Sequence, residues 1–280
     1  MLEAKKTLSF EAFASLPEYQ EVNERFVDLI PIADNQLIVE IGSGRGNLTE
    51  FLFKKAPQAE IICIDIARTL LIAGKNKLGQ NKIHFIQGRA EDLPNFLNVK
   101  ADGVIIGNAI HNFANKPQLI EAVYNILKPG GFFAFNSAFA KEGMPRSERP
   151  FYTHWMRHTR TNLKVWAKVD PEILIKGEKP EARRQLSLNE YCKLLEEVGF
   201  KIIIDENHRV VPVILGLNAF QAISADPDFI SGVLQDLNVK KEEYLRSGSQ
   251  ILKTAAALAF AQLGQNSSVR VWIQLIAQKF

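Results

Sequence analysis

The sequence predicts an α/β protein built on a mostly parallel β-sheet. Short apolar runs without alternation recur along the chain, and such runs are typical of strands buried on both faces. Amphipathic helical stretches separate several of these runs, and a glycine-rich turn directly follows the first one. Strands that alternate with helices in this way form parallel sheets, because the helix carries the chain back across the sheet.

The composition is that of a globular protein. The 280 residues are 46% hydrophobic and 23% charged, which excludes a disordered or fibrous chain. Two cysteines are too few for a disulfide framework and favour a reducing compartment. We find neither a secretion signal nor an apolar stretch of the roughly 20 residues that a membrane span needs, so we expect a cytoplasmic protein. A net charge of only +3 does not indicate a nucleic-acid partner.

The first elements follow from hydrophobic spacing. Apolar residues at i, i+4, i+7 and i+8 predict a helix from Pro17 to Ile30, which ends before Pro31. The first strand, Leu37 to Ile41, leads into Gly42-Ser43-Gly44-Arg45-Gly46 and then into a second helical pattern. Four more apolar runs follow, at 61–64, 83–86, 104–106 and 132–135. A helix before the last of these is expected to stop at Lys128-Pro129-Gly130-Gly131.

The later elements complete a sheet of seven strands. Ser187-Leu188-Asn189-Glu190 has the spacing of a capping box, which predicts the start of a helix. That helix is expected to run to Val198 and to stop at Gly199. The sixth strand is predicted at 202–204 and the seventh at 269–277.

Two stretches interrupt this alternation, at residues 138–186 and 206–266, and the second is largely helical by pattern. Both follow strands in the half of the chain where an open sheet has its ligand crevice, so we interpret them as lid insertions. A packing subdomain without ligand contact is the alternative. The predicted division is a core at 1–137, a lid at 138–186, a core helix and strand at 187–205, a helical lid at 206–266 and the final strand at 267–280.

The glycine turn carries the most specific signal. Its pattern is G-x-G-x-G, whereas the dinucleotide fingerprint is G-x-G-x-x-G and position 47 is Asn47. Glu40, inside the preceding strand, would repel a pyrophosphate but suits the ammonium of an amino-acid-like ligand. Asp65, at the end of the second strand, is placed to accept hydrogen bonds from two ribose hydroxyls.

Together with four later motifs, these residues resemble the class I S-adenosylmethionine-dependent methyltransferases, in particular the small-molecule branch that includes the quinone-pathway enzymes. The later motifs are Gly88-Arg89-Ala90-Glu91-Asp92-Leu93-Pro94, Gly107-Asn108-Ala109-Ile110-His111, Lys128-Pro129-Gly130-Gly131 and the approach to the sixth strand at 194–200. The resemblance covers about residues 17–137 and 187–205 plus the final strand. It implies a seven-stranded Rossmann-like sheet, mostly parallel with an antiparallel last strand, and helical lid insertions.

The resemblance also implies a cofactor, S-adenosyl-L-methionine, and the residues that hold it. Glu40 with the backbone of Gly42, Gly44 and Gly46 would hold the methionine end, Asp65 the ribose, Ile66 one face of the adenine, Ala90 and Glu91 its polar edge, and Asn108 would complete the cofactor site after the fourth strand. The chain departs from the branch at Arg89, where an acidic residue is common.

Methyl transfer needs a base only if the acceptor must lose a proton. His111, beside the expected methyl position, and His154 in the aromatic segment are the candidates, together with His158. Each of these has a structural alternative: a turn cap or loop contact for His111, and surface or packing for the other two. His154 and His158 share a helical face, but no acidic or cysteine partner lies nearby in the sequence, so we expect no metal site.

The expected substrate is a small organic metabolite methylated at carbon, oxygen or nitrogen. Aromatic residues in the first lid can wall an apolar or ring-containing molecule, and arginines there can pair with an acidic group: Phe151, Tyr152, Trp155, Trp166, Arg157, Arg160, Arg183 and Arg184. These same side chains equally suit a core or a solvated face. Two other functions remain open, an NAD-dependent oxidoreductase and a methyltransferase fold repurposed as a non-methylating catalyst or binding module.

Overall fold

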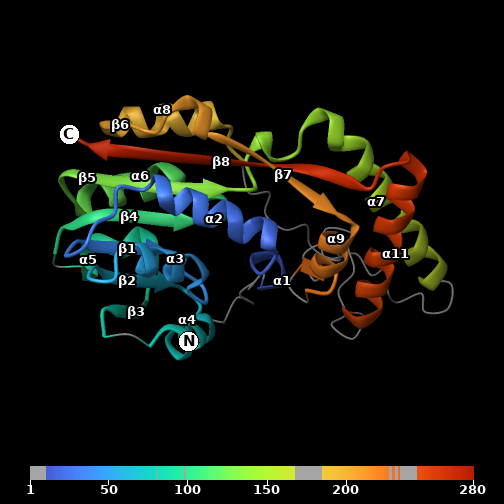
Figure 1. Cartoon of the computed structure of the whole chain (residues 1–280), viewed down its shortest axis with the longest axis horizontal. Coiled ribbons are helices and arrows are strands. Elements are labelled where there is room, and N and C mark those ends of the chain that lie inside the picture. The colour runs from blue at the N-terminus through green and yellow to red at the C-terminus, as the bar shows by residue number, and fades with distance from the viewer. Residues whose placement is uncertain are drawn as a thin grey trace. The chain divides into compact units, whose positions relative to one another are not determined.

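In a computed structural model of the chain, one mixed sheet carries the N-terminal motifs (Figure 1). The structure describes residues 11–79, 81–97, 99–167, 185–226, 229–230, 233 and 245–280. The strands are β1 Leu37–Ile41, β2 Glu60–Asp65, β3 Ile83–Gln87, β4 Ala101–Gly107, β5 Leu127–Ser137, β6 Phe200–Ile202, β7 Val210–Gly216 and β8 Ser267–Lys279. The main helices are α1 Glu11–Ala14, α2 Pro17–Leu29, α3 Asn47–Lys55, α4 Arg68–Leu78, α5 Leu93–Phe96, α6 Lys116–Ile126, α7 Arg149–Ala167, α8 Leu188–Val198, α9 Leu217–Ile223 and α11 Leu245–Leu263.

The strands are arranged in the order β3-β2-β1-β4-β5-β8-β6, and β7 also pairs with β8. Strands β1 to β5 pair in parallel, whereas β8 runs antiparallel to both β5 and β6. The predicted α/β class, the mostly parallel sheet and its antiparallel last strand are therefore confirmed. Because β1 and β4 are neighbours, the segments that follow them leave the sheet side by side at one edge.

Three details of the sheet differ from the prediction. Strand β7 lies in a stretch that we expected to be largely helical, and Pro212 within it has no N–H to donate. Strand β5 begins at Leu127, five residues early, because Leu127 pairs with Ala101 ahead of an irregularity in the register. Strand β6 occupies 200–202 rather than 202–204, since the chain passes straight from Gly199 into pairing with β8.

The predicted helix boundaries agree closely with the structure. Helix α2 ends one residue before the predicted Ile30, and the Lys55 ammonium donates to the main-chain oxygens of Val27, Asp28 and Ile30 at its C-terminal end. At α8 the Ser187 side chain accepts from the Glu190 N–H, and the Glu190 side chain accepts from the Ser187 N–H, so the capping box is present. Gly199 ends this helix with φ 105°, in the left-handed region.

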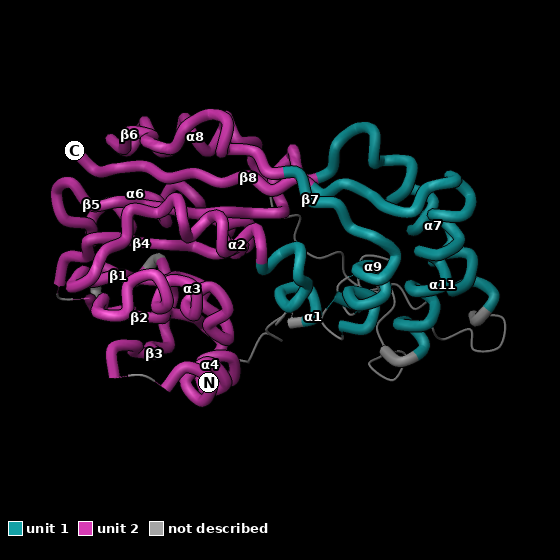
Figure 2. The backbone as a smooth tube through the Cα atoms, in the orientation of Figure 1, with its two compact units in different colours: residues 1–20, 144–182, 212–270 teal, residues 21–143, 183–211, 271–280 magenta. Residues whose placement is uncertain are grey.

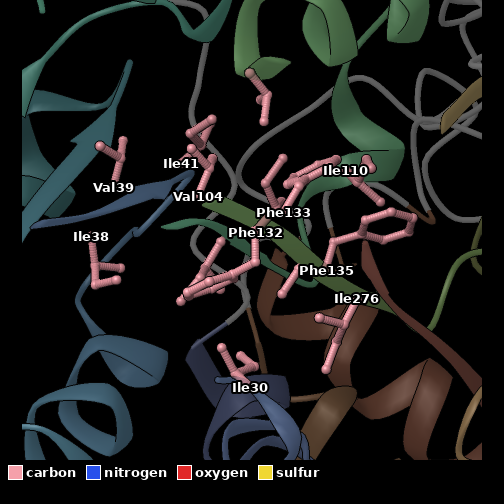
Figure 3. Close-up of a cluster of buried hydrophobic side chains, with 14 of the residues drawn as sticks. Ile30, Ile38, Val39, Ile41, Val104, Ile110, Phe132, Phe133, Phe135 and Ile276 are labelled. Atoms are coloured by element: carbon pink, nitrogen blue, oxygen red, sulfur yellow. The ribbon is translucent and has the colours of Figure 1, made fainter. Parts of the chain in front are cut away.

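A single apolar core fills the region between the sheet and its helices. Figure 3 shows side chains of β1, β4, β5 and β8 meeting Ile30, which directly follows α2, and Ile110, from the turn after β4. Ile38, Val104 and Phe135 are each fully buried, as expected for strands with helices on both faces. This core fixes the strand ends from which the candidate site residues project.

The chain divides into two compact units (Figure 2). Unit 2 comprises residues 21–143, 183–211 and 271–280 and contains most of the sheet. Unit 1 comprises residues 1–20, 144–182 and 212–270, which include most of both predicted insertions together with the N-terminal segment. None of the described helices is both long enough and apolar enough to cross a membrane.

Unit 1 has an aromatic core of its own. The Phe151 ring lies 4.3 Å from that of Phe260 and 4.7 Å from that of Phe220, measured between centroids. Trp155 packs edge-on against Phe220, and its indole N–H donates to the main-chain oxygen of Leu252 at 3.0 Å. Phe151 and Trp155 are almost completely buried, so they stabilise this unit by packing.

Candidate functional site

The glycine turn after β1 depends on left-handed backbone. Gly42, Gly44 and Gly46 have φ of 68°, 54° and 77°, where L side chains are strained. At Gly42 a Cβ would also lie 2.8 Å from the Ala109 Cβ, so glycine lets the turns after β1 and β4 approach each other. At Gly44 a Cβ would meet nothing within 4 Å, so the space above this backbone is open. The turn therefore offers exposed main chain to a ligand.

Glu40 is a buried carboxylate next to this turn. Its side chain is in the interior of β1, where Oε2 accepts a hydrogen bond of 2.5 Å from the Thr49 hydroxyl of α3. The pKa of Glu40 is raised to about 8. Burial is the main cause, the Thr49 hydrogen bond opposes the shift, and the nearby Asp65 charge adds to it. A ligand cation at this position would remove much of that penalty, which fits the ammonium group that the sequence predicts here.

The surroundings of Glu40 are polar but tightly packed. The Thr49 hydroxyl also lies 3.5 Å from the Cys63 sulfur, and burial raises the pKa of that thiol. Cys63 is therefore a neutral packing group rather than a nucleophile. Ser43, in the turn itself, is buried as well.

Asp65 has a structural task that the sequence did not predict. One carboxylate oxygen accepts from the Gly44 N–H at 2.9 Å and the other from the Ala67 N–H at 2.8 Å. Asp65 thus holds the glycine turn against the end of β2. Each oxygen has a second lone pair, so the predicted hydrogen bonds with ribose hydroxyls remain possible in this geometry.

The residues expected around an adenine follow β2 and β3. Ile66 exposes 59% of its surface, which is unusual for isoleucine and leaves an apolar face beside Asp65. Ala90 is buried at the start of a short 3₁₀ helix, Ala90–Asp92. Glu91 belongs to that helix, but its side chain lies outside the described part of the structure. Arg89, the departure from the family pattern, is exposed.

Asn108 adopts a left-handed conformation at the end of β4, with φ 45°. Its main-chain N–H donates to Asn136 Oδ1 at 2.8 Å, and its own Oδ1 accepts from the Ala138 N–H at 2.9 Å. Asn108 is thus tied to the end of β5 through both its main chain and its side chain. Its side-chain amide nitrogen can donate to a cofactor, and Oδ1 keeps a second lone pair.

His111 lies in unit 2, in the 3₁₀ turn Ile110–Asn112 that follows Asn108. Its Nδ1 is 3.2 Å from the Ser137 hydroxyl, and its ring lies 4.3 Å from that of Phe139. The Ser137 oxygen also accepts from the Phe139 N–H, which fixes its position. An imidazole in this position can exchange a proton near neutral pH, which is the chemistry that the sequence predicts for His111.

His154, the second candidate base, lies in unit 1 on α7 and hydrogen-bonds with Arg157. The rings of His154 and His158 are stacked with centroids 6.4 Å apart, and His158 Nε2 lies 2.9 Å from Gln262 Oε1. Within the described ranges no group of three or more His, Cys, Asp or Glu is arranged to hold a metal ion. Arg183, Arg184 and the side chain of Trp166 lie outside the described residues.

Sequence reasoning missed two residues that the structure adds to the site. Thr49 hydrogen-bonds Glu40 from nine positions along the chain, and Asn136 supports Asn108 from 28 positions away. Thr49 falls three residues after the last turn glycine, where a hydroxyl pointing back at the strand could have been suspected. Asn136 is an amide that directly follows the apolar run 132–135 of β5, and this position could have drawn attention to it.

Comparisons with known proteins point to a methyltransferase domain. Residues 39–135 match the family described as a methyltransferase domain. The ubiquinone/menaquinone biosynthesis C-methyltransferase UbiE of Vibrio campbellii is 30% identical over 110 residues, which are 38% of this chain and 42% of that protein. Malonyl-(acyl-carrier protein) O-methyltransferase 2 of Ilyobacter polytropus is 26% identical over 241 residues, 82% of this chain and 83% of that protein.

Among solved structures, the YcgJ protein of Bacillus subtilis superposes with a TM-score of 0.58 at 18% identity, over 92% of this chain and 98% of that chain, which supports the fold. The chain spans less than half the length of the quinone-biosynthesis relatives that it matches. The matched residues 39–135 include the glycine turn, Asp65 and the segment after β4. These residues therefore match a methyltransferase domain, and the chain is similar to the quinone-biosynthesis methyltransferases.

Proposed function

We propose that this protein transfers a methyl group from S-adenosylmethionine to a small organic acceptor. The observation that carries the proposal is the buried acidic side chain of Glu40 beside the open space at Gly44, since a methionine ammonium there would offset the cost of burying the Glu40 charge. When bound, the cofactor supplies an electrophilic methyl group on a sulfonium. A nicotinamide dinucleotide would instead bring its pyrophosphate to the turn next to Glu40. Those negative charges would raise the pKa of Glu40 further, so this side chain would offer the pyrophosphate no attraction.

The chain's own residues would then do three things. Glu40 binds the ammonium and Asp65 the ribose, while Ile66 covers one face of the adenine and Ala90 and Glu91 its polar edge. The backbone of the glycine turn and Asn108 orient the methionine end. Holding the acceptor in line with the methyl carbon and away from water supplies most of the rate, because displacement at a sulfonium is limited by alignment.

The acceptor is proposed to be a small metabolite with an apolar or ring-containing body and an acidic group. One relative is named as a C-methyltransferase of ubiquinone/menaquinone biosynthesis and the other as a malonyl-(acyl-carrier protein) O-methyltransferase, so carbon and oxygen are both candidate acceptor atoms. If the acceptor atom carries a proton, His111 is the proposed base, and His154 in unit 1 is the second candidate. The two insertions in unit 1 are proposed to bind the acceptor.

Parallel titration calorimetry with S-adenosylmethionine, S-adenosylhomocysteine and NAD tests the cofactor without knowledge of the acceptor. We expect micromolar binding of the two sulfur compounds, about −8 kcal/mol, and no binding of NAD. Binding of NAD alone would replace the proposal with hydride transfer. Absence of binding by all three would indicate a fold repurposed for another task.

A further inference from the structure

Three asparagines from separate elements of unit 2 form a buried chain of hydrogen bonds. Asn23 is on α2, Asn136 near the end of β5 and Asn108 at the end of β4. Asn136 Nδ2 donates to Asn23 Oδ1 at 3.0 Å, and Asn136 Oδ1 accepts from the Asn108 N–H at 2.8 Å. Asn136 is fully buried and Asn23 is 9% exposed, so water does not compete for the bond between these two side chains, whereas Asn108 is half-buried.

The main-chain N–H of Asn108 determines the direction of the whole chain of bonds. A main-chain N–H can only donate, so Asn136 must face it with its oxygen and therefore turns its NH₂ group toward Asn23. Asn23 must in turn present its oxygen. An apolar residue at position 23 would leave the buried Asn136 NH₂ without this acceptor, a loss that is costly in an interior.

The C-terminal end of β5 makes two further hydrogen bonds to the segment that follows β4. The Ala138 N–H binds Asn108 Oδ1, and the Ser137 hydroxyl binds His111 Nδ1. Three consecutive residues, Asn136, Ser137 and Ala138, thus hold Asn108 and His111 in place. Asn108 is a non-glycine residue with φ 45°, a strained conformation that needs such support.

We infer that Asn136 and Asn23 are positioning residues that hold Asn108 in its left-handed conformation for the cofactor, so that helix α2 takes part in shaping the cofactor site. The inference rests on the proposed function for its effect on cofactor binding. The hydrogen-bond chain itself is independent of that function. Neither asparagine touches the reacting atoms; both act through Asn108.

The test compares Asn23→Ala with Asn23→Asp and with the control Asn115→Ala. Asn115 caps α6 by accepting from the Gln118 N–H, so its removal also costs stability but leaves the asparagine chain intact. Asn23→Asp keeps an oxygen that accepts from Asn136 Nδ2. Two quantities are measured in each variant: the exchange rate of the Asn108 amide hydrogen by NMR, and the affinity for S-adenosylhomocysteine by calorimetry.

In Asn23→Ala we expect Asn108 amide exchange to rise and affinity to fall, each by about tenfold, with both near wild type in the other two variants. Unchanged exchange in Asn23→Ala would overturn the inference. An equal loss of affinity in Asn115→Ala would overturn it as well, because general destabilisation would then explain the effect. If the wild-type chain does not bind S-adenosylhomocysteine, the proposed function fails, whereas the exchange rates still decide whether Asn23 holds Asn108.

Discussion

Replacing Glu40 by glutamine is expected to stabilise the protein while weakening cofactor binding. The pKa of Glu40 is about 8 in the folded chain against an ordinary value of 4.5. As pH rises above 4.5, this carboxyl group ionises in the unfolded chain, whereas in the folded chain it stays protonated until pH approaches 8. Ionisation therefore favours the unfolded state, and the free energy of unfolding decreases as pH rises from the lower pKa to the higher one. Glutamine carries no charge at any of these pH values, and its oxygen can still accept from Thr49.

The size of the effect follows from the two pKa values. Each pKa unit corresponds to about 1.4 kcal/mol, so the full shift is worth about 5 kcal/mol above pH 8. Between pH 5 and pH 7 the stability of the wild-type chain should fall by about 2.5 kcal/mol relative to Glu40→Gln. These values come from a fully buried group, for which solvent does not screen the penalty.

Urea unfolding at pH 5 and pH 7 measures this difference. Glu50→Gln is the matched control, because Glu50 is exposed on α3 and pairs with Lys77 at 2.8 Å. Its effect should stay below about 1 kcal/mol at both pH values. Calorimetry at pH 7 should show at least about tenfold weaker binding of S-adenosylhomocysteine to Glu40→Gln. A stability difference between wild type and Glu40→Gln that is the same at both pH values would refute the reasoning.

Three further substitutions test other parts of the structure. Asp65→Asn puts an NH₂ group against one of the two N–H groups that Asp65 accepts from, so S-adenosylhomocysteine affinity should fall about tenfold by calorimetry; an unchanged affinity would remove Asp65 from the ribose site. His111→Ala should lower kcat about 100-fold with little change in cofactor affinity if His111 is the base, and full turnover would exclude that role. Ser187→Ala breaks the capping box of α8 and should cost about 1 kcal/mol in urea unfolding without altering cofactor affinity.

Local signals in the sequence predicted much of the fold. The helix from Pro17, the capping box at Ser187 and the stop at Gly199 depend on neighbouring residues, and the structure confirms them. Strand β7 escaped prediction because Pro212 interrupts its apolar run, and its existence depends on pairing with β8, more than 50 residues later. Pairing between distant segments leaves no periodic trace in either one.

The candidate site likewise has parts that the sequence predicted and parts that depend on strand pairing. The glycine turn, Glu40 and Asp65 could be found because each occupies a fixed place relative to a strand end. The sequence could not predict the hydrogen bonds that these residues make with one another. The Gly44 N–H, for example, donates to Asp65 only because β1 and β2 are neighbours in the sheet. The support of Asn108 by Asn136 likewise arises only when β4 and β5 pair. Residue roles remain predictions, whereas these contacts are features of the structure.

The position of β8 has a consequence for how the protein is made. Strand β6 pairs with β8, and β8 separates it from β5, yet more than 60 residues of chain lie between β6 and β8. A ribosome adds about 5–20 residues per second, so β6 waits several seconds after its synthesis before its partner emerges. During that interval the outer edge of β5 is also uncovered and can pair with another strand. Slower translation or lower temperature should therefore change the yield of folded protein more than the stability of the finished fold would suggest.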